Sequence, residues 1–278
     1  LIFLPLFVFG QKDHCYIDNE DSAICYVLKQ YIKPQIVLEK KWESKEIAAL
    51  YQIPLIADMD GDCITEILMS GINNLDGSKL DTPRLHFYDG RDGTLKWKFD
   101  CYGFDPFLTP VLADVDNDGI KEILVASHSG PSSWAGFISC YEYTGKLKWK
   151  SDEYFYNRDY DPGHAIFGVA DFDQDGKTEV YSTNRIFNGQ TGKLLGGGGT
   201  NGIGATHLND GSGKIAFSLS VAAQLDEDPN DLELAAGHTV YKVKIANQSG
   251  KAGNQLIPIK INVDNQFRDG NTSIGDIN

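Results

Sequence analysis

The sequence is poor in the residues that several common protein classes need. It has 25 lysines and arginines against 39 aspartates and glutamates, a formal net charge of −14, so the basic surface of a nucleic-acid binder is missing. The five cysteines include no CxxC pair, which excludes the zinc and redox motifs built on that spacing. No stretch of helical length has a 3.6-residue hydrophobic period. These absences favour a protein built from strands.

Long hydrophobic runs are also lacking. The longest, residues 1–10 (LIFLPLFVFG), is well short of the roughly 20 residues that span a bilayer. It resembles the end of a secretory signal peptide with cleavage before Gln11, so residues 1–10 are predicted to be a truncated signal peptide of a secreted protein. The alternative is a buried N-terminal strand. We expect no transmembrane span.

What the sequence does contain is an internal repeat. Three segments share one pattern and a fourth is a degenerate copy; the step between them is about 55 residues. They are residues 56–68 (IADMDGDCITEIL), 112–124 (LADVDNDGIKEIL), 169–181 (VADFDQDGKTEVY) and 223–234 (AQLDEDPNDLEL), and GDIN at 275–278 begins a fifth.

Each repeat reads as four short strands separated by turn residues. An apolar segment enters the Asp-rich loop, a β-branched run leaves it, and two further segments such as RLHFYD and LKWKFD follow. Four-stranded units that stack radially predict an all-β fold, a β-propeller of about four blades plus the start of a fifth. A solenoid of β-hairpins is the alternative. Trp97 and Trp149, at equivalent positions, are predicted to lie between blades.

The predicted organisation has three parts. A signal remnant at 1–10 precedes a leading segment at 11–48, in which residues 34–42 (PQIVLEKKW) resemble a ring-closing strand. The propeller repeats occupy 49–278. Because propellers need about four to eight blades, the sequence suggests an incomplete ring and further C-terminal domains.

The Asp-rich loops have the composition of a site for a hard cation. Calcium takes six to eight oxygen ligands, and alternate acidic residues in a tight loop can turn toward one ion. Acids at loop positions one, three, five and nine, with the carbonyl of position seven, form the predicted metal ligands. These are Asp58, Asp60, Asp62, Ile64 and Glu66 in the first loop, Asp114, Asp116, Asp118, Ile120 and Glu122 in the second, and Asp171, Asp173, Asp175, Lys177 and Glu179 in the third.

An EF-hand does not explain these loops. It needs glutamate at position twelve and flanking helices, whereas position twelve is Met69, Val125 or Ser182 and strands are predicted on both sides. The fourth copy has Gln224 in place of the first acid and Glu233 one residue late, so metal binding there is left open. The cation is expected to stabilise the fold.

The DxDxDGxxE loops preceded by alanine, as in VADFDQDGKTEV, resemble the FG-GAP/VCBS repeats of integrin α-like propellers. The stretch GHAIFGVADFDQDGKTEVYSTNRIFNGQTGKLL is similar to secreted surface proteins of Bacteroidetes. The resemblance implies Ca²⁺ in the intact loops and an adhesion or recognition module at the cell surface, with an extracellular glycan or protein as partner.

Two enzyme interpretations are the alternatives. Rhamnogalacturonan lyases, which act on acidic glycans, are similar calcium-loaded propellers, and His164, His128 and Arg158 are the side chains that could serve such chemistry. The pieces DGRDGTLKW and YTGKLKW resemble quinoprotein dehydrogenase repeats, but as blade-closing turns they do not bind the quinone. We expect a binding protein. The predicted projecting segments contain the aromatic residues Trp134, Tyr154, Phe155, Tyr156 and Tyr160, which are either ligand contacts or loop packing.

Overall fold

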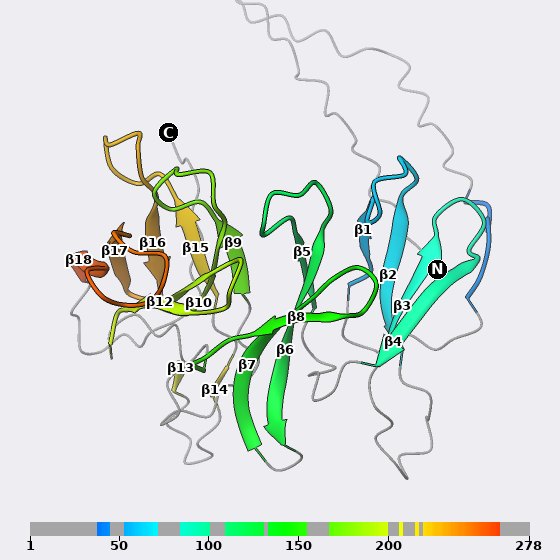
Figure 1. Cartoon of the computed structure of the whole chain (residues 1–278), viewed down its shortest axis with the longest axis horizontal. Helices are drawn as coiled ribbons and strands as arrows, with labels where there is room; N and C mark the ends of the chain where they lie inside the picture. The colour runs from blue at the N-terminus through cyan, green and yellow to red at the C-terminus, as the bar shows by residue number, and fades with distance from the viewer. Residues whose placement is uncertain are drawn as a thin grey trace, which may run out of the picture. The chain divides into compact units, whose positions relative to one another are not determined.

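The computed structural model divides the chain into two compact units, Leu1–Ser44 and Lys45–Asn278 (Figure 1). It describes residues 38–44, 53–71, 84–100, 109–130, 133–154, 167–199, 206–207, 215–216 and 219–261. In the first unit, residues 38–44 form neither helix nor strand, and Leu38 is 73% exposed. Trp42 and Ser44 are half-buried. The role of residues 34–42 as a ring-closing strand stays a prediction, and residues 34–37 lie outside the described part.

The described part of the second unit contains strands and no helix, as predicted. Each sequence repeat forms one antiparallel four-stranded sheet with its strands in chain order, which we call a blade (Figure 1). Blade 1 contains β1 (Leu55–Ala57), β2 (Glu66–Gly71), β3 (Arg84–Asp89) and β4 (Leu95–Asp100); blade 2 contains β5 (Val111–Ala113), β6 (Glu122–Gly130), β7 (Ser133–Tyr141) and β8 (Leu147–Lys150). Blade 3 contains β9 (Phe167–Ala170), β10 (Glu179–Ser182), β11 (Arg185–Asn188) and β12 (Leu194–Gly197); blade 4 contains β15 (Ser220–Ala223), β16 (Glu233–Ala236), β17 (Thr239–Lys244) and β18 (Gln255–Ile261). Strands β13 (Thr206–His207) and β14 (Ile215–Ala216) form a separate two-stranded sheet.

The blades are held together by the hydrophobic side chains between their faces. One cluster joins blades 1 and 2, a second joins blades 2 and 3, and a third joins blades 3 and 4. Trp149 lies in the second cluster and donates its indole N–H to the carbonyl oxygen of Gly189 in blade 3, at 2.8 Å. Trp97 packs against the first cluster. Both tryptophans therefore contact the next blade, as predicted. Within the described part of the chain, the four blades form an open series that does not close into a ring.

A β-bulge occurs at the same place in all four blades, between the third and fourth strands. The pairing skips one residue of the fourth strand, which is left unpaired. The skipped residues are Lys96, Lys148, Leu195 and Ile259. The type of residue at this position differs between blades, and this difference affects the loops described below.

Glycine is required where the third strand of a blade crosses the loop before the second strand. Gly189 N–H donates to the Thr178 carbonyl oxygen at 3.0 Å, and a Cβ at Gly189 would lie 2.2 Å from that oxygen. Gly90 makes the equivalent approach to Thr65 in blade 1. Any side chain at either position would push the third strand away from the loop.

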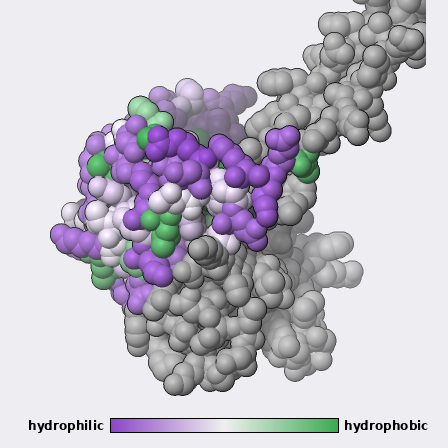
Figure 2. Space-filling model, turned by 90° about the vertical axis from the view of Figure 1, so that its right-hand side faces the viewer, coloured by the Kyte–Doolittle hydropathy of each residue, from purple (hydrophilic) through white to green (hydrophobic). Residues whose placement is uncertain are grey.

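The described surface on the side of the molecule seen in Figure 2 is mainly hydrophilic, with hydrophobic residues in small, separate groups. No described helix is long and apolar enough to cross a bilayer. Cys140 is buried in the core, whereas Cys63 is exposed.

Candidate functional site: four acidic loops

The Asp-rich segments are the loops that join the first and second strands of each blade. We call them loop 1 (58–66), loop 2 (114–122), loop 3 (171–179) and loop 4 (224–233). Each is closed by an alanine opposite a glutamate: Ala57 and Glu66, Ala113 and Glu122, Ala170 and Glu179, and Ala223 and Glu233. The common register means that all four loops start from the same strand geometry.

The glutamate at the end of each loop is a buried clamp. Its side chain folds back so that Oε2 accepts the backbone N–H of the second loop residue. The donors are Met59 to Glu66 (2.8 Å), Val115 to Glu122 (3.0 Å), Phe172 to Glu179 (3.0 Å) and Leu225 to Glu233 (2.8 Å). All four glutamates are at most 1% exposed. Each carboxylate is therefore fixed, with its other oxygen free to meet a second group.

The acids at loop positions one and five hold the turn of each intact loop. In loop 2, Asp114 accepts the backbone N–H groups of Asp118 and Gly119 at 3.1 and 2.9 Å, and loop 3 repeats both bonds through Asp171. The fifth-position acids each accept the N–H of the seventh residue: Asp62 from Ile64, Asp118 from Ile120, and Asp175 from Lys177. These bonds fix the backbone that carries the predicted carbonyl ligand.

Two residues in each intact loop have positive φ. At position six, Gly119 and Gly176 are left-handed, and Cys63 adopts φ 63° in loop 1 without being glycine. Position four is also left-handed, at Gly61, Asn117 and Gln174, which the sequence did not indicate. Asparagine tolerates this region better than most side chains, whereas cysteine at φ 63° is strained. Each intact loop therefore has one non-glycine residue with positive φ: Cys63 in loop 1, Asn117 in loop 2 and Gln174 in loop 3.

The loops bring most predicted ligands into three-carboxylate groups. In each group one oxygen per residue lies within 4.8 Å of the others. The groups are Asp58, Asp60 and Asp62; Asp114, Asp116 and Glu122; Asp171, Asp173 and Glu179; and Asp226, Asp231 and Glu233. Glu66, Asp118 and Asp175 lie outside these groups in their own loops. The metal role of the individual ligands, including the Ile64, Ile120 and Lys177 carbonyls, stays a prediction.

Loops 1 and 2 receive a lysine from the β-bulge. Lys96 Nζ lies 2.7 Å from Glu66 Oε1 and 3.0 Å from Asp60 Oδ2. Lys148 forms ion pairs with Asp116 and with Glu122 Oε1, the latter at 2.9 Å. The hydrogen bond to Glu66 raises the pKa of Lys96 above its ordinary value, against the effect of burial. Both lysines therefore place a permanent positive charge beside the acids.

Loop 3 has no such lysine, because the skipped residue is Leu195, which is buried in the core between blades 3 and 4. Among the described residues, none forms an ion pair with Asp173 or Glu179; the second oxygen of Glu179 accepts from the Gln248 amide of blade 4, at 3.0 Å. Burial raises the pKa of Glu179 to about 7 and also raises that of Asp173. Lys177 of loop 3 pairs with Asp175 at 2.6 Å, outside the three-carboxylate group, so the charge of that group is the least compensated of the three intact loops.

The donor set suits a hard divalent cation. All side-chain ligands in the groups are carboxylate oxygens, which calcium and magnesium prefer over nitrogen or sulfur. Asp116 Oδ1 and Asp173 Oδ1 are buried without a hydrogen-bond partner, so an oxygen in each of loops 2 and 3 awaits a positive group. The residues present fit such an ion.

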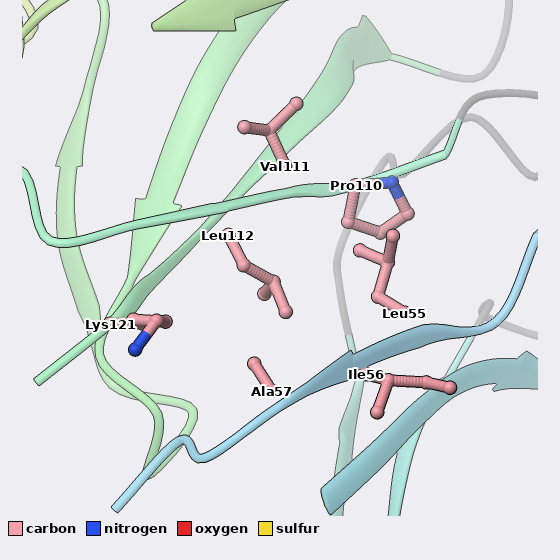
Figure 3. Close-up of a pocket in the computed structure, with 7 residues that line it drawn as sticks. All are labelled: Leu55, Ile56, Ala57, Pro110, Val111, Leu112 and Lys121. Atoms are coloured by element: carbon pink, nitrogen blue, oxygen red, sulfur yellow. The ribbon is translucent and has the colours of Figure 1, made fainter. Parts of the chain in front are cut away.

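A groove between the first strands of blades 1 and 2 offers less chemistry. It is lined by Leu55, Ile56, Ala57, Pro110, Val111, Leu112 and Lys121 (Figure 3). Figure 3 shows Leu112 and Ala57 pointing toward each other between the strands. The one ionisable side chain, Lys121, donates to the Asp58 carbonyl oxygen at 3.3 Å. The groove therefore contains no pair of groups suited to acid–base catalysis.

The side chains considered for lyase chemistry lie outside the described part of the structure: residues 158 and 164 are not described, and only the backbone of His128 is, within β6. Of the projecting aromatic residues, only the Tyr154 side chain is described. Its ring packs against Phe137 at a centroid distance of 4.6 Å, which favours loop packing over ligand contact for this residue.

The sequence analysis did not predict that the bulge lysines contact loops 1 and 2, nor that loop 4 contains a three-carboxylate group. The signal for the lysines was present, because LKWK occurs in both blade 1 and blade 2 with lysine at the skipped position. Asp231 and Lys242, which meet in loop 4, follow no repeated pattern. Their contact could be found only once the strands were paired.

Comparison with known proteins agrees with the loop pattern. Residues 114–182, covering loops 2 and 3, match the family model of the FG-GAP-like repeat. No curated protein sequence matches the chain.

Among similar solved structures is the V. cholerae biofilm matrix protein Bap1, with 18% identity, a TM-score of 0.47, and coverage of 73% of this chain and 32% of Bap1. The exotype rhamnogalacturonan lyase YesX has 18% identity and a TM-score of 0.46, with 68% of this chain and 34% of YesX covered. Bacillus licheniformis rhamnogalacturonan lyase PL11 has 18% identity and a TM-score of 0.36, with 73% of this chain and 46% of the lyase covered. The chain thus spans about a third to a half of each of these proteins. Residues 114–182 thus match an FG-GAP-like repeat, and the four described blades have the sheet topology of β-propeller blades.

Proposed function

We propose that this chain is a calcium-stabilised recognition module of an extracellular surface protein, binding a glycan or another protein. The observation that carries the proposal is the recurring carboxylate group in the loops, anchored each time by a buried glutamate that clamps the loop backbone. The matched FG-GAP-like repeat supports the same assignment.

Calcium fits the loops better than magnesium does. Magnesium requires near-ideal octahedral geometry and keeps several waters, whereas calcium accepts six to eight oxygens in a flexible arrangement. The loops offer different sets of carboxylates: the group of loop 1 contains the acid at position five and omits the glutamate, while those of loops 2 and 3 do the reverse. The expected ligands are the acids and seventh-position carbonyls of loops 1, 2 and 3.

The ion would have a structural role. Neighbouring loops contact each other: the Asn117 amide donates to the Gly176 carbonyl oxygen, and the Gln174 amide donates to that of Pro229 at 2.7 Å. An ion that rigidifies one loop therefore supports the adjacent blade. The loops would hold the blades in place while their exposed edges and connections meet the ligand.

The first test is a thermal melt of the purified chain with calcium and with excess chelator. A ligand at about a thousand times its dissociation constant stabilises by about 4 kcal/mol, so we expect calcium to raise the melting temperature by roughly 10 °C. Asp171→Asn should remove part of this rise. Asp92→Asn, which alters an exposed turn acid outside the loops, should leave it unchanged. Equal melts in calcium and chelator would show that the loops are only acidic turns.

Recognition is tested separately. We expect the chain to bind a member of a glycan or protein array in calcium buffer, without chemical change to the ligand. Release of unsaturated, ultraviolet-absorbing oligosaccharides from acidic glycans would instead indicate a lyase, as in the rhamnogalacturonan lyases to which the fold is similar.

A further inference from the structure

Loop 4 departs from the repeat pattern but retains its anchor. Gln224 replaces the first acid, and one extra residue separates the fifth position from the glutamate. Nevertheless the Ala223–Glu233 pair closes the loop, and Leu225 N–H donates to Glu233 Oε2 at 2.8 Å, as the second residue does in every other loop. The extra residue is therefore accommodated within the loop, and the glutamate keeps its place.

The extra length supplies a replacement acid. Asp231 lies two residues before Glu233, and its side chain is 14% exposed. One oxygen each of Asp226, Asp231 and Glu233 lies within 4.8 Å of the other two, the same spacing as in loops 2 and 3. Asp231 thus restores the three-carboxylate group that the loss of the first acid would have removed.

An independent observation indicates that a positive group is missing from this loop. Glu233 is 0% exposed, and its Oε1 is buried without a hydrogen-bond partner. The corresponding oxygen accepts from Lys96 in loop 1 (2.7 Å), Lys148 in loop 2 (2.9 Å) and Gln248 in loop 3 (3.0 Å). In blade 4 the skipped bulge residue is Ile259, which cannot donate. A buried carboxylate oxygen without a partner is costly, so this oxygen requires a cation or a proton.

The lysine of loop 4 does not fill that role. Lys242 reaches the loop from β17 and contacts Asp226, Asp228 and Asp231 at 3.3, 3.3 and 3.0 Å. It forms no described ion pair with Glu233. One ammonium beside these four carboxylates leaves a charge of roughly −3, which a divalent cation would largely neutralise. Asp231 Oδ1 is also buried without a partner.

We propose that loop 4 is a further divalent-cation site, rebuilt with Asp226, Asp231 and Glu233 as ligands and taking a hard, oxygen-preferring ion such as calcium. The site shares its ion with the proposed function but depends on its own residues. Lys242 neutralises the outer face of the group, while the cation meets the buried oxygen of Glu233. The one-residue insertion is the structural means by which the chain keeps a site despite Gln224.

The test measures calcium bound per chain by equilibrium dialysis of the full chain, at about 1 mM free calcium, in the range of extracellular calcium modules. Asp231→Asn is nearly isosteric and is expected to lose about one bound calcium. Glu227→Gln, an exposed acid of the same loop, is the matched control and should lose none. A melt in chelator checks that both variants are folded. Unchanged calcium binding by folded Asp231→Asn would overturn the proposal.

A second background separates this site from the other loops. In the triple variant Asp58→Asn, Asp114→Asn and Asp171→Asn, about one calcium per chain is expected to remain, and adding Asp231→Asn should abolish it. Loss of all calcium from the triple variant would refute loop 4 as a site. If the unaltered chain bound only one calcium, and Asp231→Asn removed it, the proposal for loops 1 to 3 would fail while loop 4 stood.

Discussion

Loops 2 and 3 have acids at the same positions and the same backbone hydrogen bonds, yet the charge of their three-carboxylate groups is compensated to different degrees. In loop 2, Lys148 contacts Glu122 and Asp116. In loop 3, Leu195 occupies the equivalent bulge position and Gln248 of the next blade contacts Glu179. The cause is one residue in the fourth strand, which follows the loop glutamate by 26 positions in blade 2 (Glu122 to Lys148) and by 16 in blade 3 (Glu179 to Leu195). A motif therefore fixes where carboxylates lie, whereas a distant bulge residue sets how much they repel each other.

This comparison ranks the loops for cation binding. An ammonium held among the carboxylates competes with a metal ion, since both are attracted by the same charge. Loop 3, with its weaker compensation, is expected to bind calcium more tightly than loop 2 and to be less stable without it.

The largest expected difference is between Glu122→Gln and Glu179→Gln, measured by urea unfolding in chelator. Removing one partner of a buried pair costs about 3 kcal/mol, so Glu122→Gln should be strongly destabilised because Lys148 loses a charged partner. Glu179→Gln should change stability by less than about 1 kcal/mol, because the new amide keeps the Phe172 bond and no cation is stranded. An equal decrease in the free energy of unfolding of the two variants would contradict the proposed difference between loops 2 and 3.

A smaller effect is expected from pH. Burial raises the pKa of Glu179 to about 7, so the metal-free folded state binds more protons than the unfolded state between that value and its ordinary pKa of 4.5. Stability in chelator should therefore increase, by roughly 1 to 3 kcal/mol, as pH falls from about 8 to about 5. Thermal melts across this range test it.

Glu179→Gln is the control for the pH effect and should flatten this part of the profile. In saturating calcium the trend should reverse, because protons then compete with the ion for the carboxylate. A wild-type profile in chelator that falls with decreasing pH over the same range would contradict the prediction.

The smallest effect is expected from exchanging the compensating groups. Lys148→Met removes the ammonium from loop 2 and should tighten calcium binding there by roughly tenfold, about 1.4 kcal/mol. Gln248→Lys should weaken binding at loop 3 by a similar factor. Calorimetric titration measures both, and Lys146→Met, at an exposed turn of the same blade, is the control. Shifts in the opposite directions would refute competition between lysine and metal.

The repeats predicted most of the fold because each strand and turn depends on local residues. The four blades, the tryptophans between them and the clustering of acids in the loops all follow from patterns within one repeat. The contact of Gln248 with Glu179 spans 69 positions and depends on how two blades pack, so no local pattern contains it.

For the same reason, the sequence alone does not decide metal binding by loop 4. The sequence shows the loss of an acid at Gln224, but only the pairing of Ala223 with Glu233 shows that Asp231 lies within the loop. The bulge lysines were visible as a repeated residue. Their role was not, because the skipped position is a property of strand pairing.

The contacts between successive loops have a mechanical consequence. The Lys121 side chain reaches loop 1, Asn117 reaches loop 3, and Gln174 reaches loop 4, so the loops form a linked chain along one edge of the blades. In an array whose units contact only their neighbours, a local failure weakens the adjoining interfaces and no others. A force applied to a bound ligand would therefore be distributed over several loops along this edge. Loss of the structure of one loop would destabilise only the interfaces beside it.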